Sequence, residues 1–139
     1  MYGTQRALSA YKTIGVETGV EAADPHKLVL MLFDGAMIAT QEARRHLAEG
    51  NLAERGAAIS KSIMIIENGL KASLDRSAGG ELAERLASLY DYMRSRLLLA
   101  NIKGLDEPLA EVYRLLAELR DAWAQVGGNP ARDRMKGAA

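Results

Sequence analysis

The sequence predicts an all-α fold: an antiparallel up-down four-helix bundle with a short N-terminal helical segment and a disordered C-terminal tail. Helix-forming Leu, Ala, Glu, Arg and Met dominate the composition, and aromatic residues make up only 5%. Glycines stand where long apolar-periodic segments end, and the three prolines avoid the segment interiors. The short connections make successive helices antiparallel neighbours.

The first predicted helix covers residues 25–49 and has a well-specified start. Asp24 can accept a hydrogen bond from the amides of the first turn, and Pro25 fits the first helical position. Gly50 ends the helix, and Asn51 is available to cap the next one. One face collects Leu28, Leu32, Gly35, Ala36, Ala39 and Ala43, whereas Val29, Leu30, Phe33 and Met37 point away from it. Either the chain's own N-terminal segment or another protein must cover this second face.

Three further helices are predicted over residues 52–77, 81–103 and 106–127. The Gly79-Gly80 pair separates the second from the third, and Asp106 is expected to cap the fourth. The expected core stripes are Ile59, Ile63, Ile66, Leu70, Ser73 and Leu74; Leu82, Leu86, Leu89, Met93, Leu97 and Ala100; and Leu109, Val112, Leu116, Leu119, Trp123 and Val126. We therefore divide the chain into an N-terminal segment (1–20), the bundle (21–127) and the tail (128–139).

The composition argues against several classes of function. Eighteen basic and eighteen acidic residues balance, so no overall field favours nucleic acid or an anionic membrane. The absence of cysteine excludes disulfides and thiolate metal sites and fits a reducing compartment. No apolar run approaches a bilayer span and no secretory leader is evident, so we expect a cytoplasmic protein without membrane insertion.

The residues show no pattern of an active site. No Gly-rich phosphate loop or nucleophile motif is present, and no base lies near the helical serines. His26 and His46 are more simply packing and capping residues than metal ligands. We expect a protein that is not an enzyme and that needs no metal or cofactor.

Apolar surface beyond the core stripes is the stronger signal. Ala58, Ser62, Ile65 and Gly69 form a row of mostly small residues, either an open groove or a contact inside the bundle. Off-stripe residues in the third helix are Tyr92, Leu98, Leu99 and Ile102, and Tyr113 and Leu115 widen the face of the fourth. Either a helix-in-groove partner or self-association as a homodimer would cover such a surface.

Several strings, in order and in register over roughly residues 7–125, closely resemble the flagellin-specific export chaperones of the FliS family. They are Ala10-Tyr11-Lys12 with Val16-Glu17-Thr18, Pro25-His26-Lys27-Leu28 with Met31-Leu32-Phe33-Asp34-Gly35-Ala36, Ile66-Glu67-Asn68-Gly69-Leu70 with Ser73-Leu74-Asp75, Gly79-Gly80-Glu81-Leu82 with Leu89-Tyr90-Asp91-Tyr92-Met93, and Ala100-Asn101.

The resemblance implies a cytosolic, non-enzymatic helical bundle that binds the C-terminal region of flagellin. Such a protein keeps flagellin from polymerising early and helps deliver it to the flagellar type III export gate. The family's N-terminal segment, carried here by Leu8 and Tyr11, would cover Val29, Phe33 and Met37 and shift when the client binds, or would contact the gate. The client-binding candidates are Val29, Phe33, Met37, Ala58, Ser62, Ile65, Gly69, Tyr92, Leu98, Leu99 and Ile102. The alternative is a generic helical regulator that sequesters another cytosolic factor, and binding to other flagellar proteins is also left open.

Overall fold

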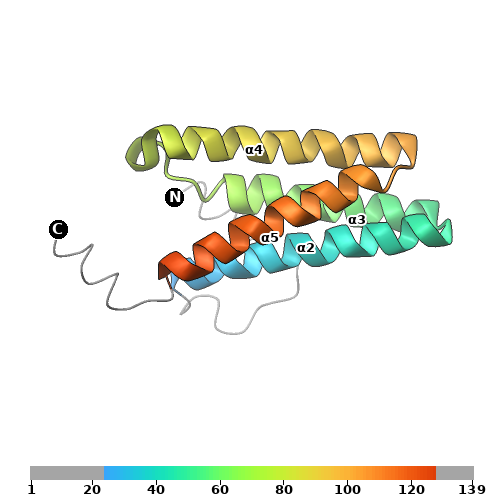
Figure 1. The fold of residues 1–139 in the computed structure, drawn as a ribbon, viewed down its shortest axis with the longest axis horizontal. Helices are drawn as coiled ribbons and strands as arrows, with labels where there is room; N and C mark the ends of the chain where they lie inside the picture. The colour runs from blue at the N-terminus through green and yellow to red at the C-terminus, as the bar shows by residue number, and fades with distance from the viewer. Residues whose placement is uncertain (1–23, 128–139) are drawn as a thin grey trace.

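The computed structural model describes residues 24–127, which fold into four α-helices and one π-helical segment. The elements are α2 (Pro25–Glu49), α3 (Leu52–Met64), η1 (Ile65–Lys71), α4 (Arg76–Lys103) and α5 (Glu107–Gly127). Successive helices run in opposite directions along one long axis (Figure 1). The predicted all-α, up-down four-helix bundle is therefore confirmed. The predicted N-terminal segment and tail lie outside the described residues, and so do residues 21–23, which the sequence assigns to the bundle.

Each helix of the bundle packs against two neighbours. The first helix, α2, contacts α3 with η1 on one side and α5 on the other, and α4 in turn contacts α3 with η1 and α5. The helices α2 and α4 are therefore diagonal to each other across the core. No helix in the described range is long and apolar enough to cross a membrane.

The first helix begins and ends where the sequence indicates. The Asp24 carboxylate accepts a hydrogen bond of 2.8 Å from the Lys27 amide, and Pro25 occupies the first turn. Gly50 ends α2 in the left-handed conformation with φ 76°, and Gly104 ends α4 with φ 66°. A side chain is strained at such φ values, so both glycines are stop signals that depend only on local geometry.

Asn51 and Asp106 stand directly before α3 and α5, as expected of capping residues, but their side chains bind other partners. Asn51 makes no side-chain cap to α3, and its amide instead donates to the Glu49 carboxylate at 3.1 Å. The Asp106 carboxylate accepts two hydrogen bonds from Arg44, at 2.8 and 3.0 Å. This ion pair ties the start of α5 to the end of α2, a contact between distant residues that the sequence did not indicate.

The second predicted helix ends earlier than expected. It changes to π-helical geometry at Ile65 and stops at Lys71 instead of Ser77. Asp75 then starts α4, accepting a hydrogen bond of 3.0 Å from the Ala78 amide, so the new helix begins before the glycine pair. At the glycine pair, where a helix end was expected, α4 continues with a kink. Gly80 has non-helical dihedral angles there, with φ 56° and ψ −130°.

The core agrees with the predicted stripes except in the first half of α4 and at Val126 near the end of α5, which is 37% exposed. In α4, Leu82 is 66% exposed, and the small side chains of Ala83 and Ala87 face the interior, followed by Tyr90. The most buried positions thus come one residue later than predicted until Met93, although Leu86 and Leu89 still pack against the core, partly buried. Ser73, which the sequence predicts in the core stripe of the second helix, is also exposed. It lies beyond Lys71, where η1 ends. Fully buried residues from all four helices complete the core, among them Leu32, Ile59, Ile66, Leu97, Leu109, Val112 and Leu116.

Candidate functional site

The small-residue row on α3 and η1 is covered by neighbouring helices of the bundle. Ala58, Ser62, Ile65 and Gly69 are all buried. The Ser62 hydroxyl lies 2.9 Å from the Thr40 hydroxyl and donates to the Ala36 carbonyl of α2 at 3.4 Å. Of the two alternatives for this row, the structure has the contact inside the bundle and not the open groove. The reason is that this helix has two neighbours, α2 and α4, and needs two buried rows to pack against both.

The second face of α2 is also used within the bundle. Phe33 is only 3% exposed and belongs to the hydrophobic core, and Val29 and Met37 are partly buried against that core. The α5 helix lies along this side, where Arg120 Nε donates to Asp34 Oδ1 at 2.6 Å. The apolar excess of α2 thus reflects a second neighbouring helix. The expected cover, with Leu8 and Tyr11, lies outside the described residues.

The helix ends are joined by a reciprocal contact between His26 of α2 and Trp123 of α5. The Trp123 indole N–H donates to the His26 carbonyl at 2.9 Å, and His26 Nε2 lies 2.7 Å from the Trp123 carbonyl. Because a carbonyl only accepts, His26 Nε2 must carry a proton. The two rings also stack, with centroids 5.2 Å apart. His26 therefore stabilises the contact between α2 and α5.

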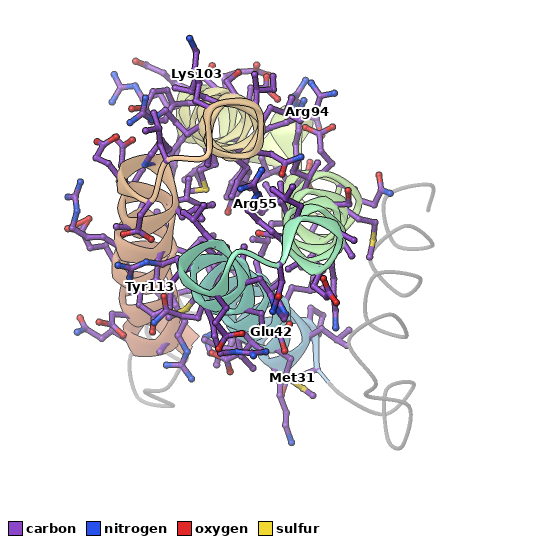
Figure 2. All side chains as sticks on the ribbon, turned by 90° about the vertical axis from the view of Figure 1, so that its right-hand side faces the viewer. Met31, Glu42, Arg55, Arg94, Lys103 and Tyr113 are labelled. Atoms are coloured by element: carbon purple, nitrogen blue, oxygen red, sulfur yellow. The ribbon has the colours of Figure 1, made fainter. Side chains whose placement is uncertain are left out.

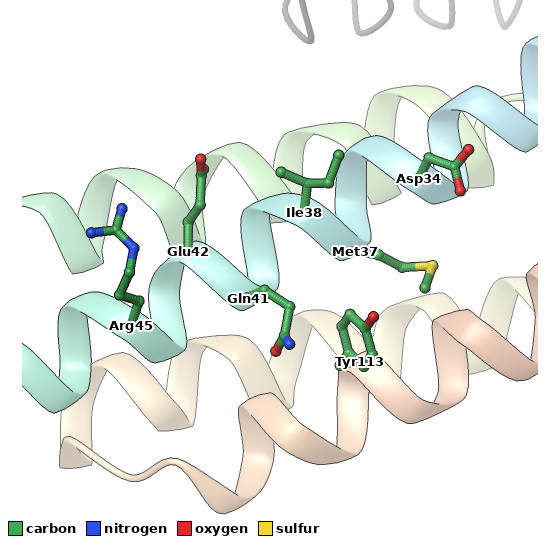
Figure 3. A pocket seen from close by; sticks show the side chains of 7 residues that line it. All are labelled: Asp34, Met37, Ile38, Gln41, Glu42, Arg45 and Tyr113. Atoms are coloured by element: carbon green, nitrogen blue, oxygen red, sulfur yellow. The ribbon is translucent and has the colours of Figure 1, made fainter.

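A hollow of about 510 Å³ remains open where α2 meets α5. Its apolar lining comes from Met37, from Ile38, which is 59% exposed, and from Tyr113. The polar lining residues are Asp34, Gln41, Glu42 and Arg45. Figure 3 shows Met37 and Gln41 on the side of α2 toward Tyr113, whereas Ile38 and Glu42 point away from α5. We call this site the α2–α5 hollow.

Only part of the α2–α5 hollow was foreseen from the sequence. Met37 is a client-binding candidate from the sequence, and Tyr113 widens the apolar face of its helix. Ile38 was missed because it belongs to neither face considered for α2. Its signal was available, since a large apolar residue followed by Gln41 and Glu42 is unusual on a solvated helix face.

The off-stripe candidates of α4 divide into two groups. The Tyr92 hydroxyl donates to Glu111 of α5 at 2.6 Å, so Tyr92 and Leu99, seven residues later, lie on the side toward α5. Asp91 pairs with Lys71 of η1 at 2.7 Å, so Leu98, seven residues after Asp91, lies on the other side. These candidates do not form one site.

The Tyr92 group is polar. Arg96 Nε also donates to Glu111, at 2.6 Å, so one carboxylate accepts from both α4 side chains. The hydrogen bond from Tyr92, and then that from Arg96, lowers the pKa of Glu111. The same hydrogen bond to Glu111 raises the pKa of Tyr92. This network connects α4 to α5 on the Tyr92 side of α4.

Comparison with known proteins decides the family. The family profile described as "Flagellar protein FliS" matches residues 7–130. The chain is 46% identical to the flagellar secretion chaperone FliS of Salmonella typhimurium, over 88% of this chain and 91% of the relative. The Escherichia coli protein of the same name is 42% identical over 88% of each chain, and that of Bacillus subtilis 32% identical over 94% of this chain and 92% of the relative.

The chain belongs to the FliS family. The resemblance identified in the sequence is thereby confirmed, and the relatives are named flagellar secretion chaperones.

Several strings that carry the FliS resemblance make contacts that fix the bundle. Asp34 binds Arg120 across the α2–α5 contact, and Asn101 accepts from Arg55 Nε at 3.2 Å between α4 and α3. Gly69 is buried within η1. These residues act in helix packing, so the FliS pattern in this part of the chain specifies the scaffold.

Two kinds of polar feature are absent from the described part of this FliS-family chain. Among residues 24–127, no group of three or more His, Asp or Glu side chains is placed to hold a metal ion. No buried polar side-chain atom in that range lacks a hydrogen-bond partner. The open features are instead apolar surfaces with polar borders.

Proposed function

We propose that this protein is a cytoplasmic chaperone that binds the C-terminal region of flagellin without turnover. It would keep the client from polymerising and help deliver it to the type III export gate. Membership of a family whose relatives are named flagellar secretion chaperones supports this function. The structural observation that carries it is the α2–α5 hollow, an apolar site left open beside a closed core.

The hollow suits side chains from an amphipathic helix. Flagellin termini are disordered before assembly and amphipathic once helical, so they can fold as they bind. Apolar client side chains would contact Met37, Ile38 and Tyr113. Its polar lining, which includes Glu42 and Arg45, would fix the register of the bound helix.

A charge placed in the hollow tests the proposal. The Ile38→Glu variant should lose affinity for a synthetic flagellin C-terminal peptide by tenfold or more, about 1.4 kcal/mol, in isothermal titration calorimetry. Its melting temperature should hold, because the Ile38 side chain is already 59% exposed. Leu82→Glu is the matched control, since Leu82 is 66% exposed on α4, away from the hollow.

The two possible failures have different meanings. If the unmodified protein does not bind the peptide, the chaperone function is wrong. If the unmodified protein and Ile38→Glu bind with equal affinity, the function stands but the client lies elsewhere. Binding should also have a negative heat-capacity change, because apolar surface is buried.

A further inference from the structure

The C-terminal half of α4 leaves an apolar strip exposed on the outside of the bundle. Ile102 is 78% exposed and Leu98 is 38% exposed. The two side chains are four residues apart and therefore lie one above the other on the helix. Ser95, also exposed, lies beside them and adds no bulk. We call Leu98 and Ile102 the α4 outer strip.

Cations border the α4 outer strip on both sides. At about 100° per residue, Arg94 lies on one edge and Lys103 on the other. Figure 2, which looks along the bundle, shows these two side chains diverging from α4. Neither forms a salt bridge within residues 24–127. The remaining cation of this half, Arg96, is held by Glu111 at 2.6 Å.

Among residues 24–127, no acidic side chain forms an ion pair with Arg94 or Lys103. Residues 92–105 contain no Asp or Glu. The nearest acids along the chain already have partners: Asp91 lies 2.7 Å from Lys71, and Asp106 lies 2.8 Å from Arg44. The result is a local excess of positive charge around an exposed apolar strip, on a chain whose formal net charge is zero.

We infer that the α4 outer strip is a second docking surface, for an amphipathic helix of another protein whose apolar stripe is bordered by Asp or Glu. The partner's apolar side chains would cover Leu98 and Ile102, and its carboxylates would meet Arg94 and Lys103. A second copy of this chain presenting the same surface would bring like charges together, which disfavours self-association here.

This inference goes beyond the proposed function because it concerns a separate surface. The strip lies on α4, diagonal to α2 across the bundle, and shares no residue with the α2–α5 hollow. A helix bound to the strip therefore leaves the hollow accessible. The protein could hold its client and the acidic helix at the same time.

A pair of synthetic peptides tests the charge requirement. Each is an amphipathic helix of about five turns with Leu at i, i+3, i+4 and i+7, bordered by Glu in one peptide and by Lys in its twin. The full chain should bind the Glu peptide at least tenfold more tightly than the Lys twin in fluorescence anisotropy. The preference should shrink as salt is raised, because exposed charges are screened.

Charge reversal then locates the site. The double variant Arg94→Glu and Lys103→Glu should reverse the preference between the two peptides. The double variant Lys27→Glu and Arg114→Glu changes the net charge equally at exposed positions on α2 and α5 and should leave the preference intact. Ile102→Ser should weaken binding of the Glu peptide tenfold or more. Thermal unfolding checks that all variants remain folded.

Three results would overturn the inference. The first is equal binding of both peptides by the unmodified chain. The second is an equal loss of preference in both double variants, which would indicate net charge instead of a local site. The third is sedimentation showing a dimer that Ile102→Ser converts to a monomer, which would make a second copy the occupant. Failure of flagellin binding alone would leave the inference intact, since neither peptide derives from flagellin.

Discussion

Replacing Ser62 with Trp tests whether the small-residue row is closed, as the structure has it, or open to a client. Ser62 is fully buried against Thr40 of α2. Overpacking a core typically costs 1–3 kcal/mol, and a Ser-to-Trp exchange at a site without free space lies at the upper end, about 3 kcal/mol. At roughly 4 °C per kcal/mol for a domain of this size, the melting temperature should fall by about 12 °C.

Ser62→Ala is the matched control for that variant. The Thr40 hydroxyl would keep its hydrogen bond of 2.8 Å to the Ala36 carbonyl, so no buried hydroxyl loses its only partner. The net cost should be about 1 kcal/mol, which corresponds to roughly 4 °C. The order of stability should therefore be the unmodified protein, then Ser62→Ala, then Ser62→Trp.

Thermal unfolding followed by circular dichroism measures these stabilities, and calorimetry below the melting temperature measures binding of the flagellin peptide. We expect the folded fraction of Ser62→Trp to bind with the affinity of the unmodified protein. A Ser62→Trp protein that melts like the unmodified one and binds the peptide tenfold more weakly would refute the closed row. The client would then reach Ser62 directly.

Two further outcomes are expected. Tyr92→Phe should destabilise the protein most between about pH 5 and pH 9, as measured by urea unfolding across pH. The lowered pKa of Glu111 gives stabilisation that is present above its unfolded value of about 4.3 and lost as the pH falls through the folded value. The raised pKa of Tyr92 gives stabilisation that is present below about 10 and lost as the pH rises through the folded value. A difference in unfolding free energy that does not vary with pH would contradict this account. Replacing Leu8 and Tyr11 together with Ala should reduce flagellin secretion while calorimetry shows unchanged peptide affinity, if these residues contact the export gate. Loss of peptide affinity in that variant would make them part of the client site instead.

The sequence by itself determined the features that depend on a few neighbouring residues. Asp24 and Pro25 start α2, and Gly50 and Gly104 end helices, because caps and positive φ values need no distant partner. Helical periodicity predicted four antiparallel helices and most of the core, since each helix must bury one apolar stripe. Ordered strings across the chain identified the family.

Only the tertiary structure decided what covers each helix and where polar side chains bind. The sequence shows that α2 and α3 carry apolar residues beyond one stripe. The same pattern is expected whether a second helix of the bundle or a partner protein covers these residues. The bundle resolves this by placing two neighbours beside each helix, which buries Phe33 and Ser62. Asp106 pairs with Arg44 from far along the chain, a partner that local patterns cannot specify. Ile102 stays exposed because no helix of the described bundle packs over it.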